Sequence, residues 1–278
     1  MQQLMMLIEK ARPKGTRHAT NIAREYLQVL VLKAVYQSPY GRDLSFMGGT
    51  CLRLCYGLKR YSEDLDFSHD VLTENYSFAR LNEFIERRLK ERGILVETAT
   101  KEPKSVDRSF VRLSLGPLGL TERKGQKLHI KIEVDNRPPP IQSTRREEYF
   151  LARYNELFPI IKHVESTLFA GKALAILMRP QLLGRDCYDL IWYLQRHTPC
   201  DLSYLNAGLR IAKKKGAAVR DFPELLRAIR ARLKETSAPA ILADIQAFLE
   251  DPTEVEWIKR FHEVFEQIAK NHQISRQK

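Results

Sequence analysis

The stretch that decides the fold is FMGGTCLRLCYGLKRYSEDLDFS, residues 46–68. The apolar run LSFM before its glycine pair predicts a short strand, and TCLRLCYGL predicts a short helix capped by Thr50. DLDFS predicts a second strand. Because side chains alternate along a strand, Asp64 and Asp66 are expected on the same face. The stretch therefore predicts a strand, a glycine turn, a helix and a strand that carries two acids.

The glycine turn has the composition of a phosphate-binding loop. Gly48 and Gly49 lack a Cβ, so the backbone there can approach a ligand closely. A helix that begins at Thr50 offers free N–H groups and a positive dipole end, both of which favour phosphate, and the Thr50 hydroxyl adds a donor. These three residues are our candidates for nucleotide binding.

The paired acids predict a metal site. Two carboxylates on one strand face repel each other unless a cation lies between them, and hard oxygen ligands suit Mg²⁺ or Mn²⁺. A third acid is expected from the strand KLHIKIEVDN at residues 127–136, whose apolar residues alternate with polar ones. Glu133 is the first choice and Asp135 the alternative. Asp64, Asp66 and Glu133 are thus the predicted metal ligands and catalytic acids.

Further along the chain the pattern changes. Up to Phe150, helical and strand patterns are mixed, whereas the remainder has helical periodicity and strand signals stop. We therefore predict an α+β protein with a mixed-sheet domain at residues 1–155 and an all-helical domain at residues 156–278.

The charge balance points to a polyanionic partner. Lys and Arg number 46 against 34 Asp and Glu, a formal net charge of +12, which fits nucleic acid binding or simply a basic soluble protein. One basic segment contains three lysines at residues 213–215. No run reaches the length of a membrane span and the start does not read as a secretory signal, so no membrane partner and a cytoplasmic location are expected.

These motifs together resemble a known family. Gly-Gly-Ser/Thr followed by Arg-X-Ser-X-Asp-Leu-Asp-Phe is the pattern of AbiEii-type nucleotidyltransferases, toxins of type IV toxin–antitoxin and abortive-infection systems within the superfamily that includes DNA polymerase β. The matching positions are Gly48, Gly49, Thr50, Arg60, Ser62, Asp64, Leu65, Asp66 and Phe67, followed by Lys131, Ile132 and Glu133. The resemblance implies a polymerase-β-like nucleotidyltransferase domain and adds Arg60 and Ser62 to the nucleotide-binding candidates.

The helical half continues the resemblance. AGKALAILMRPQLLGRDCYDLIWYL, residues 170–194, is similar to the family pattern at Lys172, Arg179, Arg185, Asp186, Tyr188 and Asp189, although Gly171 stands where many relatives carry an acid. The resemblance implies that Lys172 and Asp186 are catalytic and that Lys172, Arg179 and Asp189 bind nucleotide.

Other roles for these residues stay open at this point. The aliphatic stem of Lys172 can equally lie along an apolar helix face, and Asp186 with Asp189 can form a structural ion-pair cluster or orient Lys172. Tyr61 and Tyr188 can stack on a base or simply pack.

The resemblance also implies a function. The expected activity is metal-dependent transfer of a nucleoside monophosphate from an NTP to an acceptor hydroxyl, with the 3′ end of tRNA as the acceptor. The protein would act as a growth-inhibiting toxin whose cognate antitoxin need not contact it. Two alternatives are a transferase that modifies protein hydroxyls and a non-catalytic nucleic-acid-binding module.

Overall fold

The computed structural model describes residues 1–71, 76–101, 105–140, 145–212 and 218–274 of the 278-residue chain, so the three lysines at 213–215 lie outside the described residues. The chain divides into two compact units. The first unit comprises Met1–Gly57, Tyr61–Pro138 and Arg146–Lys162, and the second comprises Leu58–Arg60, Pro139–Arg145 and His163–Lys278.

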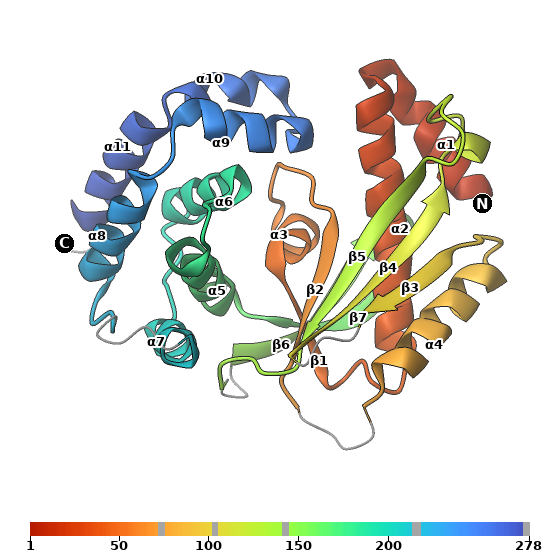
Figure 1. The fold of residues 1–278 in the computed structure, drawn as a ribbon, viewed down its shortest axis with the longest axis horizontal. Helices are drawn as coiled ribbons and strands as arrows, with labels where there is room; N and C mark the ends of the chain where they lie inside the picture. Colours follow the sequence, from red (N-terminus) through yellow and green to blue (C-terminus); the bar gives the residue numbers. More distant parts are fainter. Residues whose placement is uncertain (72–75, 102–104, 141–144, 213–217, 275–278) are drawn as a thin grey trace. The chain divides into compact units, whose positions relative to one another are not determined.

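A mixed seven-stranded sheet with the strand order β3-β4-β5-β2-β1-β7-β6 is the centre of the first unit (Figure 1). Its strands are β1 Leu44–Met47, β2 Asp64–His69, β3 Glu97–Lys101, β4 Val106–Ser114, β5 Lys127–Asp135, β6 Arg146–Arg153 and β7 Glu156–His163. β2 runs parallel to β5 and antiparallel to β1, while β4 runs antiparallel to β5. The predicted mixed sheet is therefore confirmed.

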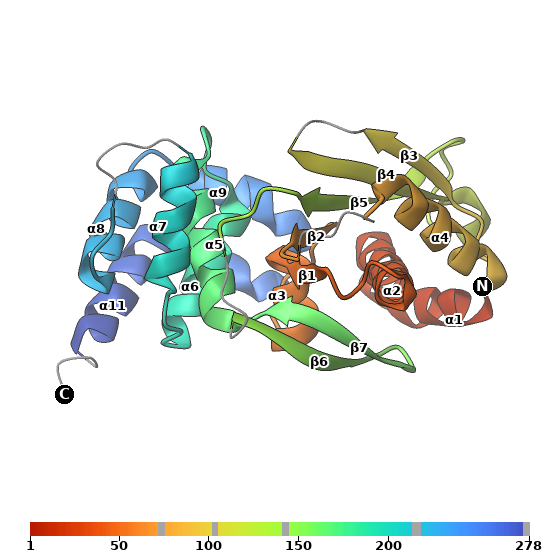
Figure 2. The ribbon, with the colours of Figure 1, turned by 90° about the horizontal axis from the view of Figure 1, so that it is seen from below.

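Helices cover the face of this sheet on which the apolar side chains of β2 and β5 lie (Figure 2). Leu65 and Phe67 of β2, with Ile130, Ile132 and Val134 of β5, are fully buried. Figure 2 shows the helices on one side of β3, β4 and β5. They are α1 Gln2–Ala11, α2 Thr16–Gln37 and α4 Phe78–Glu91. The acidic side chains of β2 and β5 belong to the opposite face.

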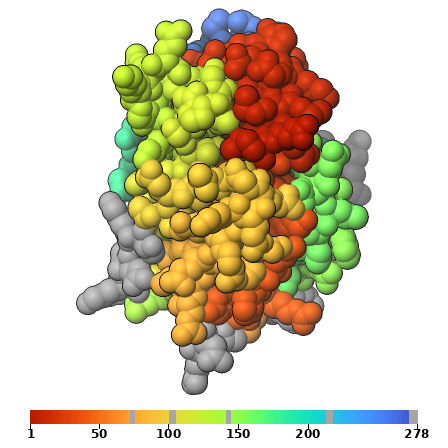
Figure 3. All heavy atoms as spheres, turned by 90° about the vertical axis from the view of Figure 1, so that its right-hand side faces the viewer, coloured from red at the N-terminus to blue at the C-terminus, as the bar shows by residue number. Residues whose placement is uncertain are grey.

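The N-terminus is fixed against the first unit. Figure 3 shows the red N-terminal segment lying beside the gold segment around α4. The amino group of Met1 donates to the carbonyl of Arg92, just beyond the end of α4, over 3.2 Å. α1 is therefore packed against this unit.

A β-hairpin extends beyond the point where strand signals were predicted to stop. That prediction is wrong, since β6 continues past Phe150 to Arg153 and β7 spans Glu156–His163. The two strands are joined by Tyr154 and Asn155, with φ values of 52° and 60°. Two positive φ angles are what a tight hairpin turn requires. The predicted boundary between residues 155 and 156 falls in this hairpin.

The second unit is helical in the residues described, which confirms the prediction of a helical C-terminal part. Its α-helices are α5 Glu165–Met178, α6 Gly184–Gln195, α7 Leu202–Ile211, α8 Phe222–Leu233, α9 Ala238–Ile245, α10 Val255–Lys259 and α11 Phe261–Ile274. The short 3₁₀ turns of the chain include η1 Arg12–Lys14, η2 Gly116–Leu118, η4 Gln246–Phe248 and η5 Pro252–Glu254. None of the helices in the described ranges combines the length and apolar composition that a membrane crossing needs.

Candidate active site

The predicted acids lie on neighbouring strands of the sheet. In the parallel pair of β2 with β5, Asp66 stands opposite Glu133 and Asp64 opposite Lys131. Residues opposite each other in a register share a face, and neighbouring strands lie about 4.8 Å apart. Asp64, Asp66 and Glu133 therefore share one polar face, which we call the acidic face.

The register also separates the two candidates for the third acid. Asp135 stands opposite Ser68, one same-face step beyond Glu133, and accepts the N–H of Arg137 over 2.9 Å. Its pKa is raised, chiefly by burial. Glu133 is thus the residue beside Asp66, and the geometry favours it over Asp135.

Two basic side chains form ion pairs with Asp64 and Glu133 of the acidic face. The Nζ of Lys131 lies 3.2 Å from Asp64 Oδ2 and 2.9 Å from Glu133 Oε2. Arg108 stands opposite Glu133 on β4, and its Nε lies 2.5 Å from Glu133 Oε1. Burial alone would raise the pKa of Glu133, but these two cations outweigh it and lower the pKa.

The carboxylates fit a hard divalent cation by their chemistry, since they offer oxygen ligands from adjacent strands. Within the described ranges, however, no three His, Cys, Asp or Glu side chains converge as a metal-binding group. The ammonium group of Lys131 instead contacts both Asp64 and Glu133.

The glycine turn lies directly against the acidic face. Helix α3, Gly48–Tyr56, follows β1 without a break, and Gly48 has a φ of +77°. A Cβ at Gly48 would lie 2.1 Å from Asp66 Oδ2. Only glycine therefore allows the backbone to pass this close to the carboxylate.

Thr50 has a different place from the one predicted. It was expected to cap the helix, but α3 begins two residues earlier and its N-cap is Met47. The Thr50 hydroxyl is buried and donates to the backbone carbonyl of Asp64. The side chain thus joins the first turn of α3 to the strand that carries the acids.

The second unit contains a buried cluster of ions. The Nε and Nη2 of Arg60 donate to the two carboxylate oxygens of Asp189 over 2.7 and 2.6 Å. Lys172 Nζ lies 2.7 Å from Asp186 Oδ1 and 2.8 Å from Asp189 Oδ2. Arg179 Nη1 lies 2.7 Å from Asp186 Oδ2. Five predicted site residues thus meet here, which we call the ion cluster.

Burial and charge act in opposite directions within the ion cluster. Burial alone would raise the pKa of Asp189, but Arg60 and Lys172 lower it. Burial would likewise lower the pKa of Lys172, but Asp186 and Asp189 raise it. Both groups are therefore held in their charged forms.

The members of the ion cluster differ in their access to a ligand. The side chains of Arg60 and Asp189 are 2% and 0% exposed, whereas those of Lys172 and Arg179 are 13% and 43% exposed. Arg60 and Asp189 are placed to hold the cluster together, and a contact of either with nucleotide stays a prediction.

Ser62, another predicted nucleotide-binding residue, lies between α3 and β2. Its backbone carbonyl accepts a hydrogen bond from the side chain of Gln28 over 3.1 Å.

Comparison with known proteins identifies the family. The family model described as "Nucleotidyl transferase AbiEii toxin, Type IV TA system" matches residues 30–269. The chain belongs to this AbiEii family. It is accordingly a nucleotidyltransferase toxin of a type IV toxin–antitoxin system, which implies an NTP substrate and an antitoxin partner. The alternative of a non-catalytic binding module is thereby set aside.

Solved structures share the fold of this AbiEii toxin at low sequence identity. MenT4, a nucleotidyltransferase toxin from Mycobacterium tuberculosis H37Rv, is 16% identical with a TM-score of 0.59, over 97% of this chain and 91% of that one. JHP933 from Helicobacter pylori is 18% identical with a TM-score of 0.53, over 92% and 95%. A putative nucleotidyltransferase from H. pylori is 18% identical with a TM-score of 0.52, over 90% and 95%. No curated protein gives a significant sequence match.

The two tyrosines considered for base stacking in this AbiEii toxin have distinct surroundings. Tyr61 is buried beneath the guanidinium of Arg53, 4.1 Å from the ring centre, and its hydroxyl lies 3.2 Å from His18 Nδ1. These contacts assign Tyr61 to packing.

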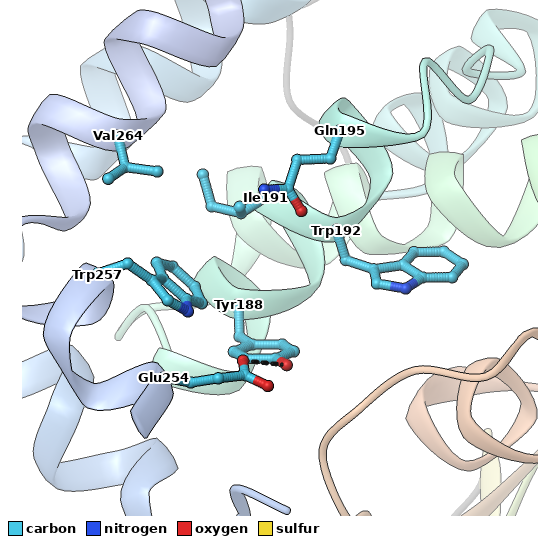
Figure 4. Close-up of a pocket in the computed structure, with 7 residues that line it drawn as sticks. All are labelled: Tyr188, Ile191, Trp192, Gln195, Glu254, Trp257 and Val264. Carbon is cyan, nitrogen blue, oxygen red and sulfur yellow. Dashed lines mark hydrogen bonds between the residues drawn. The ribbon is translucent and has the colours of Figure 1, made fainter. Parts of the chain in front are cut away.

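Tyr188 borders a cavity of about 230 Å³ in the second unit (Figure 4). Its hydroxyl donates to Glu254 over 2.5 Å and its ring lies 5.4 Å from that of Trp257. The cavity is lined by Tyr188, Ile191, Trp192, Gln195, Glu254, Trp257 and Val264. Both tryptophans of the chain line it, so intrinsic tryptophan fluorescence reports on the second unit alone.

Gly48→Ala is expected to reduce nucleotide transfer by about a hundredfold, because the new Cβ displaces the Asp66 carboxylate and a 1 Å misplacement can cost that much. The left-handed backbone should also cost about 1 kcal/mol of stability. The matched control is Gly57→Ala, which has a φ of +76° but nothing within 4 Å of its added Cβ. For each variant, a transfer assay measures the effect on activity, and thermal denaturation followed by circular dichroism measures the effect on stability. Equal loss of transfer in the two variants would mean that strain, not the contact with Asp66, is responsible.

Proposed function

We propose that this AbiEii toxin transfers a nucleoside monophosphate from an NTP to the 3′ hydroxyl of tRNA, with Mg²⁺ or Mn²⁺ held by Asp64, Asp66 and Glu133. The observation that carries the proposal is the register of β2 with β5, which puts Asp66 beside Glu133 while Gly48 touches Asp66. A bound divalent ion would supply charge neutralisation at the triphosphate and lower the pKa of the attacking hydroxyl.

The residues of the chain have separate tasks in this proposal. The N–H groups of Gly48, Gly49 and Thr50 in the first turn of α3 bind phosphate oxygens, as helix N-termini do. In the second unit, Lys172, which the ion cluster holds in its charged form, has the role of a nucleotide-binding cation together with Arg179. Asp186 fixes the position of both cations through its two oxygens.

The chemical step is a displacement at the α-phosphorus. The oxygen of the acceptor hydroxyl forms a bond to this phosphorus while the bond to the bridging oxygen of pyrophosphate breaks. The hydroxyl proton passes to a carboxylate oxygen of the acidic face, and pyrophosphate leaves with the electron pair of the broken bond. No oxidant or further reactant is needed.

The charge of the chain favours RNA as the acceptor. Even if every acid were paired with one base, 12 of the 46 Lys and Arg side chains would have no acidic partner. A surplus of this size favours a polyanion, and binding would weaken steeply as salt is raised. We place the reaction in the cytoplasm, where NTPs and tRNA are both available. A protein hydroxyl is the second candidate acceptor, since the same residues can activate either hydroxyl.

A labelling experiment tests the proposal. The purified toxin is incubated with each α-³²P-labelled NTP in turn, with Mg²⁺ or Mn²⁺, and with either total tRNA or total protein. We expect label in tRNA, with transfer that depends on the added ion and is lost when the tRNA 3′ end is oxidised with periodate. Label that enters only protein would overturn the tRNA acceptor, and full transfer in the presence of EDTA would overturn the metal requirement.

A further inference from the structure

Lys131 bridges two of the proposed metal ligands. It stands opposite Asp64 in the register of β2 with β5, and it lies two residues before Glu133 on the same face of β5. Its ammonium group is within 3.2 Å of a carboxylate oxygen of each acid. A strand neighbour therefore supplies a positive charge between two carboxylates that would otherwise repel each other.

A divalent ion and this ammonium group compete for the same oxygens. Asp64 Oδ2 and Glu133 Oε2 face Lys131 Nζ, and an ion bound between these carboxylates would need the same space. The ammonium group of a lysine can move away from the carboxylates easily, because it is carried at the end of a flexible four-carbon side chain. Its side chain is 28% exposed, so it has a path to solvent.

We propose that Lys131 is a positioning residue that holds Asp64 and Glu133 together before the divalent ion binds, and that the ion displaces its ammonium group. This inference rests on the proposed metal-dependent function. Once displaced, the ammonium remains tethered to β5 beside the acidic face, where it adds positive charge for the incoming triphosphate. Metal affinity is then the balance between two cations that compete for one set of carboxylates.

Lys127 provides a matched control. It lies on β5 four residues before Lys131, on the same face and with a similar exposed fraction of 31%, but its ammonium pairs with Glu97. Four strand residues span about 13 Å. This exceeds the Debye length of about 8 to 10 Å at 0.1–0.15 M salt, so Lys127 should not sense an ion at the acidic face.

The first measurement is the reactivity of the two lysines. The wild-type protein is treated with limiting acetic anhydride, with and without Mn²⁺, and acetylation is quantified by peptide mass spectrometry. We expect Mn²⁺ to raise acetylation of Lys131 several-fold and to leave Lys127 unchanged, whereas an ion that bound elsewhere would not expose Lys131. In Asp64→Asn the effect of Mn²⁺ on Lys131 should disappear.

The second measurement is Mn²⁺ affinity by calorimetry. Lys131→Met should bind Mn²⁺ about fivefold more tightly than the wild type, because a contacting positive charge is removed, and Lys127→Met should match the wild type. If the wild type binds Mn²⁺ but Lys131 acetylation and the affinity of Lys131→Met stay unchanged, the displacement is wrong and the proposed function stands. If the wild type binds no Mn²⁺, the metal requirement itself fails.

Discussion

Asp66→Asn is expected to lower nucleotide transfer by about a thousandfold or more, because a bound ion contributes several kcal/mol to transition-state charge stabilisation and each factor of ten corresponds to about 1.4 kcal/mol. Asn has nearly the same shape as Asp but carries no charge, so it is a poor ligand for a hard cation. Asp66 is the acid that lies beside both Glu133 and Gly48. Its substitution should therefore reduce nucleotide transfer at least as much as substitution of Asp64 or Glu133. Transfer of α-³²P label from NTP to tRNA measures the effect.

Two further variants make the first prediction specific to the acidic face. Glu133→Gln should show a comparable loss, whereas Asp135→Asn, two residues further along β5 and opposite Ser68, should keep most of the activity. Circular dichroism of all three variants establishes that they fold. Retained activity in Asp66→Asn, or a greater loss in Asp135→Asn than in Glu133→Gln, would contradict the assignment of the metal ligands.

Local patterns were sufficient to predict the strands that carry the acids. Apolar and polar residues alternate throughout β5 and over the first four residues of β2. The two strands, and the common face of Asp64 and Asp66, can therefore be predicted from this periodicity alone. The register between them cannot, because it depends on long-range pairing. The contact of Lys131 with both Asp64 and Glu133 was therefore not predicted, although Lys131 itself was recognised as part of the sequence motif.

The hairpin of β6 and β7 was missed for a local reason. β7 contains Pro159, which argues against a paired strand, and its turn residues Tyr154 and Asn155 lack the glycine that usually signals a tight hairpin. The structure tolerates the proline because the pairing of β7 with β1 is at Phe46 and Lys162, beyond Pro159. The proline therefore need not donate to β1.

The ion cluster could be predicted only in part. Asp186 and Asp189 are three residues apart on one helix, and this spacing makes them neighbours. Lys172 could be proposed as their partner, and the structure brings the three together. The pairing of Asp189 with Arg60, which lies 129 positions away, is a result of tertiary packing that no local pattern encodes.

Arg60→Met should destabilise the second unit by about 3 to 5 kcal/mol, the usual cost of removing one partner of a buried ion pair. Asp189 is fully buried, and without Arg60 it would keep only Lys172 of its two cations. Urea denaturation followed by tryptophan fluorescence measures the loss, since both Trp192 and Trp257 belong to this unit.

Arg230→Met is the matched control for this prediction. Arg230 also makes a two-pronged ion pair in the second unit, with Glu266 at 2.6 and 2.9 Å, but the two side chains are 32% and 42% exposed. Solvent screens such a pair, so its loss should cost about 1 kcal/mol or less. Equal destabilisation by the two substitutions would mean that burial of the Arg60 pair adds nothing to stability.

The pH dependence separates the charge of Arg60 from its packing. The pKa of Asp189 is lowered in the folded protein, so its ionisation stabilises the fold above the unfolded pKa of about 3.9, and this contribution is lost as pH falls through the folded value. In Arg60→Met the guanidinium that lowers the pKa of Asp189 is absent, so this pKa is lowered less than in the wild type. The difference in unfolding free energy between wild type and variant should therefore be greatest at neutral pH and shrink below about pH 4. A difference that persisted unchanged at pH 3 would show that Arg60 stabilises the unit through the packing of its side chain and not through its charge.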